Sequence, residues 1–293
     1  MTYAKARLGI GAATAALAVL ALAGCSGSGS GGTTGLGSNG STTGGDAAAL
    51  TLVADSLNKA DSAGTVKITG TMTTPGAGGT MTMTAQEQYS PTVAMSMTMQ
   101  IQGQALSEVL TGDKIYIDYP AMSAALGGKQ WAEIDLAKSK SLGTLSSLID
   151  SAKNQNPTTQ ISALVASKAV SKVGTETVDG QQTTHYSGTL TESQLANLNN
   201  SNGQLSADQV SELKKLLSSG GVTSEKIDVW IASSGLPVEM KYSSKTSAGN
   251  VTGDMHLSDW GAKVSVGAPP ASEVYDMTSE LSGVVASAAA SKG

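Results

Sequence analysis

The sequence of 293 residues contains no phenylalanine, one cysteine and two histidines. Without a second cysteine the chain cannot form an internal disulfide, so its folded part must be held together by its own core. Three Trp and seven Tyr supply few of the large aromatic surfaces that ordinarily fill a core. We therefore expect the eleven Met, together with Leu, Ile and Val, to fill the interior.

The single cysteine, Cys25, follows the run Leu-Ala-Gly at 22–24 and ends a short apolar stretch. A basic start followed by the uncharged residues 8–23 is typical of a secretory signal. The run ending at Cys25 resembles the lipobox of bacterial lipoproteins, in which the cysteine becomes the acylated first residue. We expect residues 1–24 to be a cleaved lipoprotein signal peptide and Cys25 to carry acyl chains such as palmitate. An ordinary secreted protein and an uncleaved anchor are the alternatives, although this stretch is short for a membrane span.

The net charge of the chain and the composition of the residues after Cys25 indicate how the protein is attached to the membrane. Without residues 1–24 the net charge is −7, which argues against binding nucleic acid or adhering electrostatically to an anionic membrane. Attachment is therefore expected through acyl chains, at the outer face of the cytoplasmic membrane. Gly, Ser and Thr make up eighteen of the twenty residues at 26–45. Together with Cys25 they predict a lipidated, flexible linker over 25–45 with a reach of roughly 25 Å.

Hydrophobic periodicity predicts an α+β domain over residues 46–270. Apolar residues at helical spacing predict helices at 47–58, 142–153, from 157 onward, 191–198 and 206–219. Alternating apolar and polar residues predict strands at 66–72, 81–86, 93–101, 106–111, 115–119, 130–135, 169–190 (a hairpin), 225–232, 236–245 and 250–260. We expect about eleven strands in one large antiparallel sheet that curls and has one apolar face. Pro269 and Pro270 are expected to end the sheet, leaving 271–293 as a flexible C-terminal tail.

Motifs that would indicate catalysis are missing. Neither His185 nor His256 belongs to an HExxH pattern, and two histidines without a thiol are a weak basis for a zinc site. No serine stands in a nucleophile-elbow pattern, and the Gly-rich stretches lack the lysine of a phosphate loop. The sequence therefore predicts no enzyme, no metal and no cofactor. A hydrolase that joins one histidine to a distant serine is the least favoured hypothesis.

Six of the eleven Met lie between residues 72 and 99, in phase with the apolar sides of their strands. The simpler interpretation, favoured by the sequence alone, is that Met replaces Phe as core filler. The alternative is a Met-lined concave surface around an unfilled apolar cavity that takes acyl chains. Such a cavity would gain about 0.8 kcal/mol for each methylene that it buries.

Several segments, taken in order, resemble the actinobacterial LppX/LprG/LprA/LprF lipoproteins over roughly residues 46–270. They are the lipobox at 22–25, the strand start at 63–70, the Gly-Asp-Lys-Ile-Tyr turn at 112–116, Gln130-Trp131, the Val-Asp-Gly-Gln hairpin at 178–181, Val-Trp-Ile at 229–231 and the closing segment 257–270. The resemblance implies a curved antiparallel half-barrel with helices packed on its concave face, similar in plan to the LolA/LolB carriers. It also implies an apolar cavity that takes acylated lipids or glycolipids for transport in the cell envelope.

The wall of such a cavity maps onto the in-phase apolar residues of the predicted strands. The candidate ligand-binding residues are Val66, Ile68, Met72, Met81, Met83, Val93, Met95, Met97, Met99, Ile101, Ile115, Ile117, Ile227, Val229, Ile231, Val238, Met240, Met255 and Leu257. The expected partners are an acylated lipid or glycolipid, the membrane through the lipid anchor, and an envelope transporter, with no nucleic acid. The competing hypothesis is an envelope scaffold or sensory lipoprotein that binds a protein partner and has no ligand cavity.

Overall fold

The computed structural model describes residues 46–76, 79–138, 158–191 and 221–281, with a few single positions between 193 and 214. Outside the described residues lie the expected signal peptide 1–24, Cys25 with the linker 25–45, the predicted helix at 142–153 and most of those at 191–198 and 206–219.

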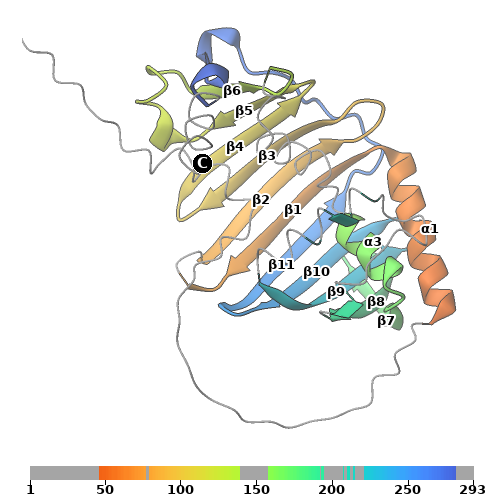
Figure 1. Cartoon of the computed structure of the whole chain (residues 1–293). Helices are drawn as coiled ribbons and strands as arrows, with labels where there is room; N and C mark the ends of the chain where they lie inside the picture. The colour runs from red at the N-terminus through yellow and green to blue at the C-terminus, as the bar shows by residue number, and fades with distance from the viewer. Residues whose placement is uncertain are drawn as a thin grey trace, which may run out of the picture.

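Twelve strands form one open sheet, which Figure 1 shows from its concave side. Along the sheet the strands follow the order β12-β6-β5-β4-β3-β2-β1-β11-β10-β9-β8-β7. Their bounds are β1 Thr65–Thr74, β2 Gly79–Gln88, β3 Ala94–Ile101, β4 Gln104–Thr111, β5 Lys114–Asp118, β6 Trp131–Asp135, β7 Ser171–Val178, β8 Gln181–Thr191, β9 Val222–Ala232, β10 Pro237–Thr246, β11 Gly249–Ser258 and β12 Val274–Asp276. Short 3-10 helices follow β5 (η2, Pro120–Met122) and precede β12 (η3, Ala271–Glu273).

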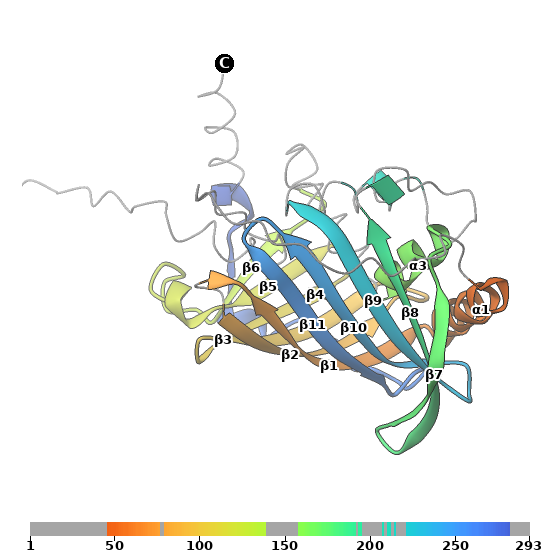
Figure 2. The ribbon, with the colours of Figure 1, turned by 90° about the horizontal axis from the view of Figure 1, so that it is seen from below.

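The sheet curves into a trough, which is plain when it is seen along its length (Figure 2). The helix α3 (Thr158–Ala166) lies inside the trough, and α1 (Ala47–Ala63) lies at the end that carries β7. Both helices pack on each other and mainly on β1 and β7–β10. The predicted fold, a large curved sheet with helices on its concave side, is confirmed.

The helix α1 forms because its sequence supplies both caps and an apolar stripe. The Asp46 side chain accepts a hydrogen bond from the Ala48 backbone N–H at 2.9 Å, which satisfies one of the free donors at the helix start. Val53 and Leu57, one turn apart, are buried in the core. Gly64 ends the helix with φ of 73°, a conformation that other residues rarely adopt.

The register of the antiparallel strands separates two faces. Ile68 on β1 pairs with Ala85 on β2 and with Leu257 on β11, and all three are buried. The next position, Thr69, pairs with Thr84 and His256. Since successive side chains of a strand point to opposite sides, every apolar residue in phase with Ile68 shares one face. We call this the inner face, and the face of Thr69 the outer face.

The C-terminal part of the domain differs from the prediction. The sheet does not end at Pro270, because β12 pairs in parallel with β6 at its edge. Beyond it, the Thr278 hydroxyl accepts a hydrogen bond from the Asp135 backbone N–H at 2.9 Å. The predicted tail boundary at 271 was therefore wrong, since β12 has only three residues and gives too short an alternation to detect.

Candidate functional site

The inner face is an almost continuous apolar surface that runs from β6 to β8. One row across the strands consists of Met255, Gly70, Met83 and Met99, followed by Leu106 on β4. Four of these residues come from the consecutive strands β1 to β4, and the pairing of β1 with β11 brings Met255 beside them. Apart from glycine and leucine, the row is made of methionine, whose flexible thioether adapts to irregular apolar partners.

The structure places the predicted cavity residues, with one exception, on this inner face. Those that are buried are Val66, Ile68, Met81, Met95, Met97, Met99, Ile115, Ile117, Ile227, Val229, Ile231, Met240 and Leu257. Those that keep part of their solvent exposure are Met72, Met83, Val93, Ile101 and Met255. All of them except Met72 and Met81 belong to one core cluster or pack against it.

The exception is Val238, whose prediction as an inner-face residue was wrong. The register of β10 against β9 shifts between Pro237 and Glu239, so that β10 has one extra residue at this point. Val238 consequently packs in a separate small cluster with Trp230 and Val178. A β-bulge shifts the alternation by one, and strict period-two reasoning places every residue before it on the wrong side.

Met83, one of the partly exposed methionines, lies on a strand outside those on which the described helices mainly pack. Met83 is on β2, whereas α1 and α3 pack mainly on β1 and on β7–β10. Met83 and Met255 also flank Gly70, which contributes no side chain to the surface between them. An apolar face whose large side chains remain in contact with solvent is the kind of surface that binds a ligand or a partner.

Three carboxyl groups on the inner face were missed by the sequence reasoning. Glu87 on β2 pairs with Val66 and Met95, and Glu108 on β4 pairs with Met97 and Ile117. Both positions are therefore in phase with the apolar residues. The signal was present in the alternation of each strand, where a glutamate occupies a position at which apolar residues are otherwise found.

The third carboxyl is Glu225 on β9, which is 2% exposed and accepts a hydrogen bond from the Ser244 hydroxyl at 3.2 Å. Burial raises the pKa of Glu87 to about 8, that of Glu108 to about 7 and that of Glu225 to about 7. The physical cause is the same for all three, since an apolar surrounding disfavours the charged form. Burial also raises the pKa of Tyr242, which lies beside Glu225 on this face, to about 12.

Glu87 combines burial with accessibility. Its pKa is raised strongly by the surrounding protein, yet its side chain keeps part of its solvent exposure. Close by, the Tyr89 hydroxyl is fully buried and has no hydrogen-bond partner among the residues that the structure describes. Burial is the largest cause that raises the pKa of Tyr89, and the nearby Glu87 carboxyl raises this pKa further. Polar groups that are enclosed but unpaired are unusual in a finished core and mark a place where another molecule can supply the partner.

Both histidines lie on the outer face and are held by carboxylates. His185 contacts Glu176 through Nδ1 and Asp228 through Nε2, each at 2.9 Å, and stacks on Trp230 with ring centroids 4.1 Å apart. With both nitrogens occupied, this imidazole has no free atom with which to accept a proton from a serine. The hydrolase hypothesis therefore finds no support at His185.

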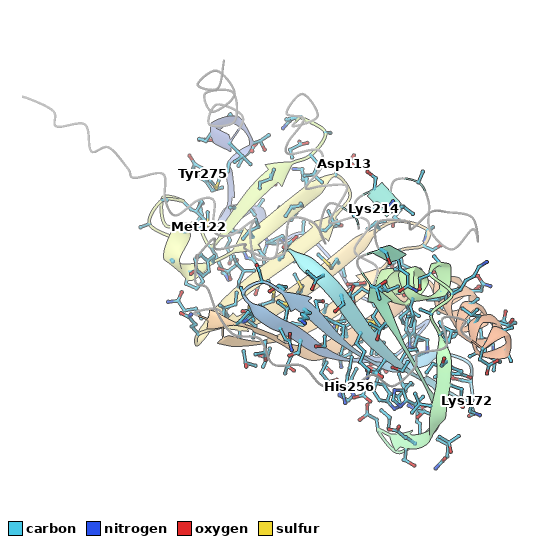
Figure 3. The ribbon with its side chains drawn as sticks, turned by 60° about the horizontal axis from the view of Figure 1, so that its bottom comes forward. Asp113, Met122, Lys172, Lys214, His256 and Tyr275 are labelled. Carbon is cyan, nitrogen blue, oxygen red and sulfur yellow. The ribbon has the colours of Figure 1, made fainter. Side chains whose placement is uncertain are left out.

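His256 is labelled in Figure 3, on the side of the sheet away from α3. Its Nδ1 lies 2.8 Å from an oxygen of Asp179, and its Nε2 faces Glu239 and Asp254 at 3.9 and 3.8 Å. The side chains of Glu239, Asp254 and His256 lie close enough together to hold a metal ion. However, the Lys241 ammonium lies 2.7 Å from Glu239 and 3.4 Å from Asp254, so a positive charge already occupies this cluster. The arrangement fits an ion-pair network better than a metal centre.

The residues that the structure describes include no helix long and apolar enough to cross a membrane. A model of the LppX_LprAFG lipoprotein family matches residues 46–266. A 31.2 kDa protein of Streptomyces griseus encoded between rplA and rplJ is 34% identical over 163 residues, which cover 55% of this chain and 52% of that protein. This chain spans about half the length of the curated relatives that it matches.

Two solved lipoprotein structures are similar to this chain. LppX of Mycobacterium tuberculosis is 17% identical with a TM-score of 0.47, and the match covers 76% of this chain and 100% of that one. LprF of Mycobacterium bovis is 18% identical with a TM-score of 0.45, and the match covers 77% of this chain and 99% of that one.

Proposed function

This chain belongs to the LppX_LprAFG lipoprotein family, and we propose that it binds an acylated lipid or glycolipid on the inner face of its sheet. The lipid is then transported or presented within the cell envelope. The observation that carries the proposal is the apolar inner face itself, on which Met72, Met83, Ile101 and Met255 keep contact with solvent.

An acyl chain is the ligand whose chemistry suits this face. The exposed side chains are unbranched thioethers and aliphatic groups, which offer contact area and few hydrogen bonds. A chain of sixteen methylene groups that left water entirely would gain roughly 13 kcal/mol before the costs of binding are subtracted. The apolar row from Met255 to Leu106 crosses five strands of the curved sheet, so a long ligand could lie across several strands.

The proposal includes attachment of the protein at the outer face of the cytoplasmic membrane through acyl chains on Cys25. Acyl anchoring fits the family, whose members are lipoproteins, and the excess of acidic residues, which gives no electrostatic attraction to an anionic membrane. The linker 25–45 would let the domain reach the bilayer surface and return from it. An envelope transporter that loads or receives the lipid is part of the same proposal.

The binding role requires no covalent chemistry. Both histidines are engaged with carboxylates on the outer face, away from the apolar surface. A scaffold without a ligand would be favoured by a broad apolar patch on the outside. Among the described residues, the large hydrophobic side chains that are exposed are Leu52 on α1 and Val173 on β7. Two such residues are ordinary for a protein surface and do not make a docking patch.

The test uses the full chain purified from membranes in a mild detergent, followed by organic extraction and mass spectrometry of the extract. We expect an acylated lipid in a fixed ratio to protein. In the Met83→Lys variant this ratio should fall at least tenfold, because a buried ammonium disfavours hydrocarbon beside it. The matched control is Thr84→Lys, which adds the same charge one residue away on the exposed outer face.

An extract without a stoichiometric lipid from the unmodified chain would refute the proposed function. An equal loss in both lysine variants would show that the inner face is not the binding surface. Thermal unfolding of each variant, followed by circular dichroism, separates loss of binding from loss of the fold.

A further inference from the structure

Two inner-face glutamates lack the partners that other buried carboxyl groups in the described part of the chain have. Glu87 and Glu108 form no ion pair and accept no hydrogen bond from any residue that the structure describes, and burial alone shifts their ionisation. On the same face, Glu225 has the Ser244 hydroxyl. On the outer face, Glu239 has the Lys241 ammonium at 2.7 Å.

Placing a carboxyl group at either of these two positions lowers the stability of the folded protein. An enclosed carboxyl without a hydrogen bond loses its hydration, and an apolar residue of similar volume would avoid that loss. Glu108 is 8% exposed and sits between Met97 on β3 and Ile117 on β5, where alternation alone would favour an apolar side chain. A carboxyl retained at such a position indicates that something other than folding uses it.

The groups lie close enough together to face one ligand. Glu87 and Glu108 are two strands apart and one in-phase position apart along the strands, so their backbones are separated by about 12 Å. Met95 and Met97 of β3 lie between them on the same face. The Tyr89 hydroxyl lies near Glu87 and is a third polar group without a partner in the described part of the chain.

We propose that Glu87 and Glu108 hydrogen-bond hydroxyl groups carried on the hydrocarbon part of the bound lipid, so that the inner face selects hydroxylated over plain acyl chains. This inference rests on the proposed function and narrows its ligand. A carboxyl group in its neutral form both donates and accepts a hydrogen bond, as a hydroxyl does, so the two groups match. Near neutral pH the raised pKa of Glu87 keeps its carboxyl group mainly uncharged. A lipid that carries an ammonium group would therefore find little negative charge here to pair with.

The experiment is a competition read by native mass spectrometry. The full chain in detergent is incubated with equal amounts of methyl stearate and methyl hydroxystearate, and the two bound masses are compared. We expect the hydroxylated ester to be bound in roughly tenfold preference, which corresponds to one well-formed buried hydrogen bond. The double variant Glu87→Leu and Glu108→Leu should lose this preference while its total occupancy by the two esters is kept.

Two further variants test whether the preference for the hydroxylated ester comes from hydrogen bonds made by Glu87 and Glu108. The double variant Glu87→Gln and Glu108→Gln retains hydrogen-bonding capacity and should keep most of the preference. The variant Gln86→Leu, on the exposed outer face, should leave the preference unchanged. Equal binding of both esters by the unmodified chain, or an unchanged preference in the double leucine variant, would overturn the inference and leave lipid binding intact. Failure of the chain to bind either ester would instead contradict the proposed function.

Discussion

Replacing Glu108 by leucine should stabilise the protein, and by an amount that depends on pH. The folded state raises the pKa of Glu108 from 4.5 to about 7 because the side chain is buried. A difference of about 2.5 units corresponds to about 3 kcal/mol between the two protonation states. The sign follows from proton binding. Between these two pKa values the folded chain holds the proton while the unfolded chain releases it, so stability falls as pH rises.

Below pH 4.5 both states are protonated, and the ionisation of Glu108 does not affect stability. Above pH 7 the full penalty of about 3 kcal/mol is present. The variants Glu108→Leu and Glu108→Gln remove the titrating group. The free energy of unfolding of each variant, minus that of the unmodified chain, should therefore increase by about 3 kcal/mol when the pH is raised from 4.5 to 8. Glu87 and Glu225 act in the same direction and should leave both variants with a remaining fall in stability over this range.

The assay is urea unfolding of the full chain in detergent, followed through the fluorescence of Trp131, Trp230 and Trp260, all of which lie in the described fold. The quantity compared is the free energy of unfolding of each variant minus that of the unmodified chain, at the two pH values. A difference that stays the same at both would refute the reasoning, because it would mean that the Glu108 carboxyl is hydrated in the folded protein.

Three other changes have defined outcomes. Gly188→Ala should destabilise the domain by about 1–3 kcal/mol in the same urea assay, since its Cβ would clash with the backbone carbonyl oxygen of Ala169. Gly174→Ala, whose Cβ meets no atom within 4 Å, should be neutral, and equal effects of the two changes would contradict this packing. Lys241→Met should cost about 1–3 kcal/mol because it leaves the buried carboxylate of Glu239 without its cation, and an unchanged urea midpoint would show that the pair contributes nothing. Cys25→Ser should move the protein from the membrane to the soluble fraction on cell fractionation, and continued sedimentation with membranes would contradict acyl anchoring.

Much of the architecture could be predicted because alternation is a local property. The strands between Val66 and Asp135 alternate apolar and polar residues over most of their length, and they were located from this pattern. The hairpin at Asp179 was identified from its turn residues. Where the alternation was broken or too short, prediction failed, as at the bulge beside Val238 and at the three-residue strand that starts at Val274.

The site was predicted less completely than the fold, for a physical reason. Periodicity assigns a side chain to a face, and this placed nearly all the candidate residues correctly with respect to the inner face. It does not report how much of that face the helices cover, so it could not distinguish buried Met97 from partly exposed Met83. The two glutamates were passed over because charged residues on strands usually face water.

The sequence by itself determined which residues form strands, which of their sides is apolar, and that a core without phenylalanine must rely on methionine. These are consequences of local spacing and composition, which need no knowledge of what lies across the sheet. The tertiary structure alone decided that β1 pairs with β11, which places Gly70 between Met255 and Met83. It also decided that Glu108 is buried on the apolar face and that Glu87 is partly covered there. Strand order joins segments that are nearly two hundred residues apart, and burial depends on every element that packs over a position, so neither can be read from the residues alone.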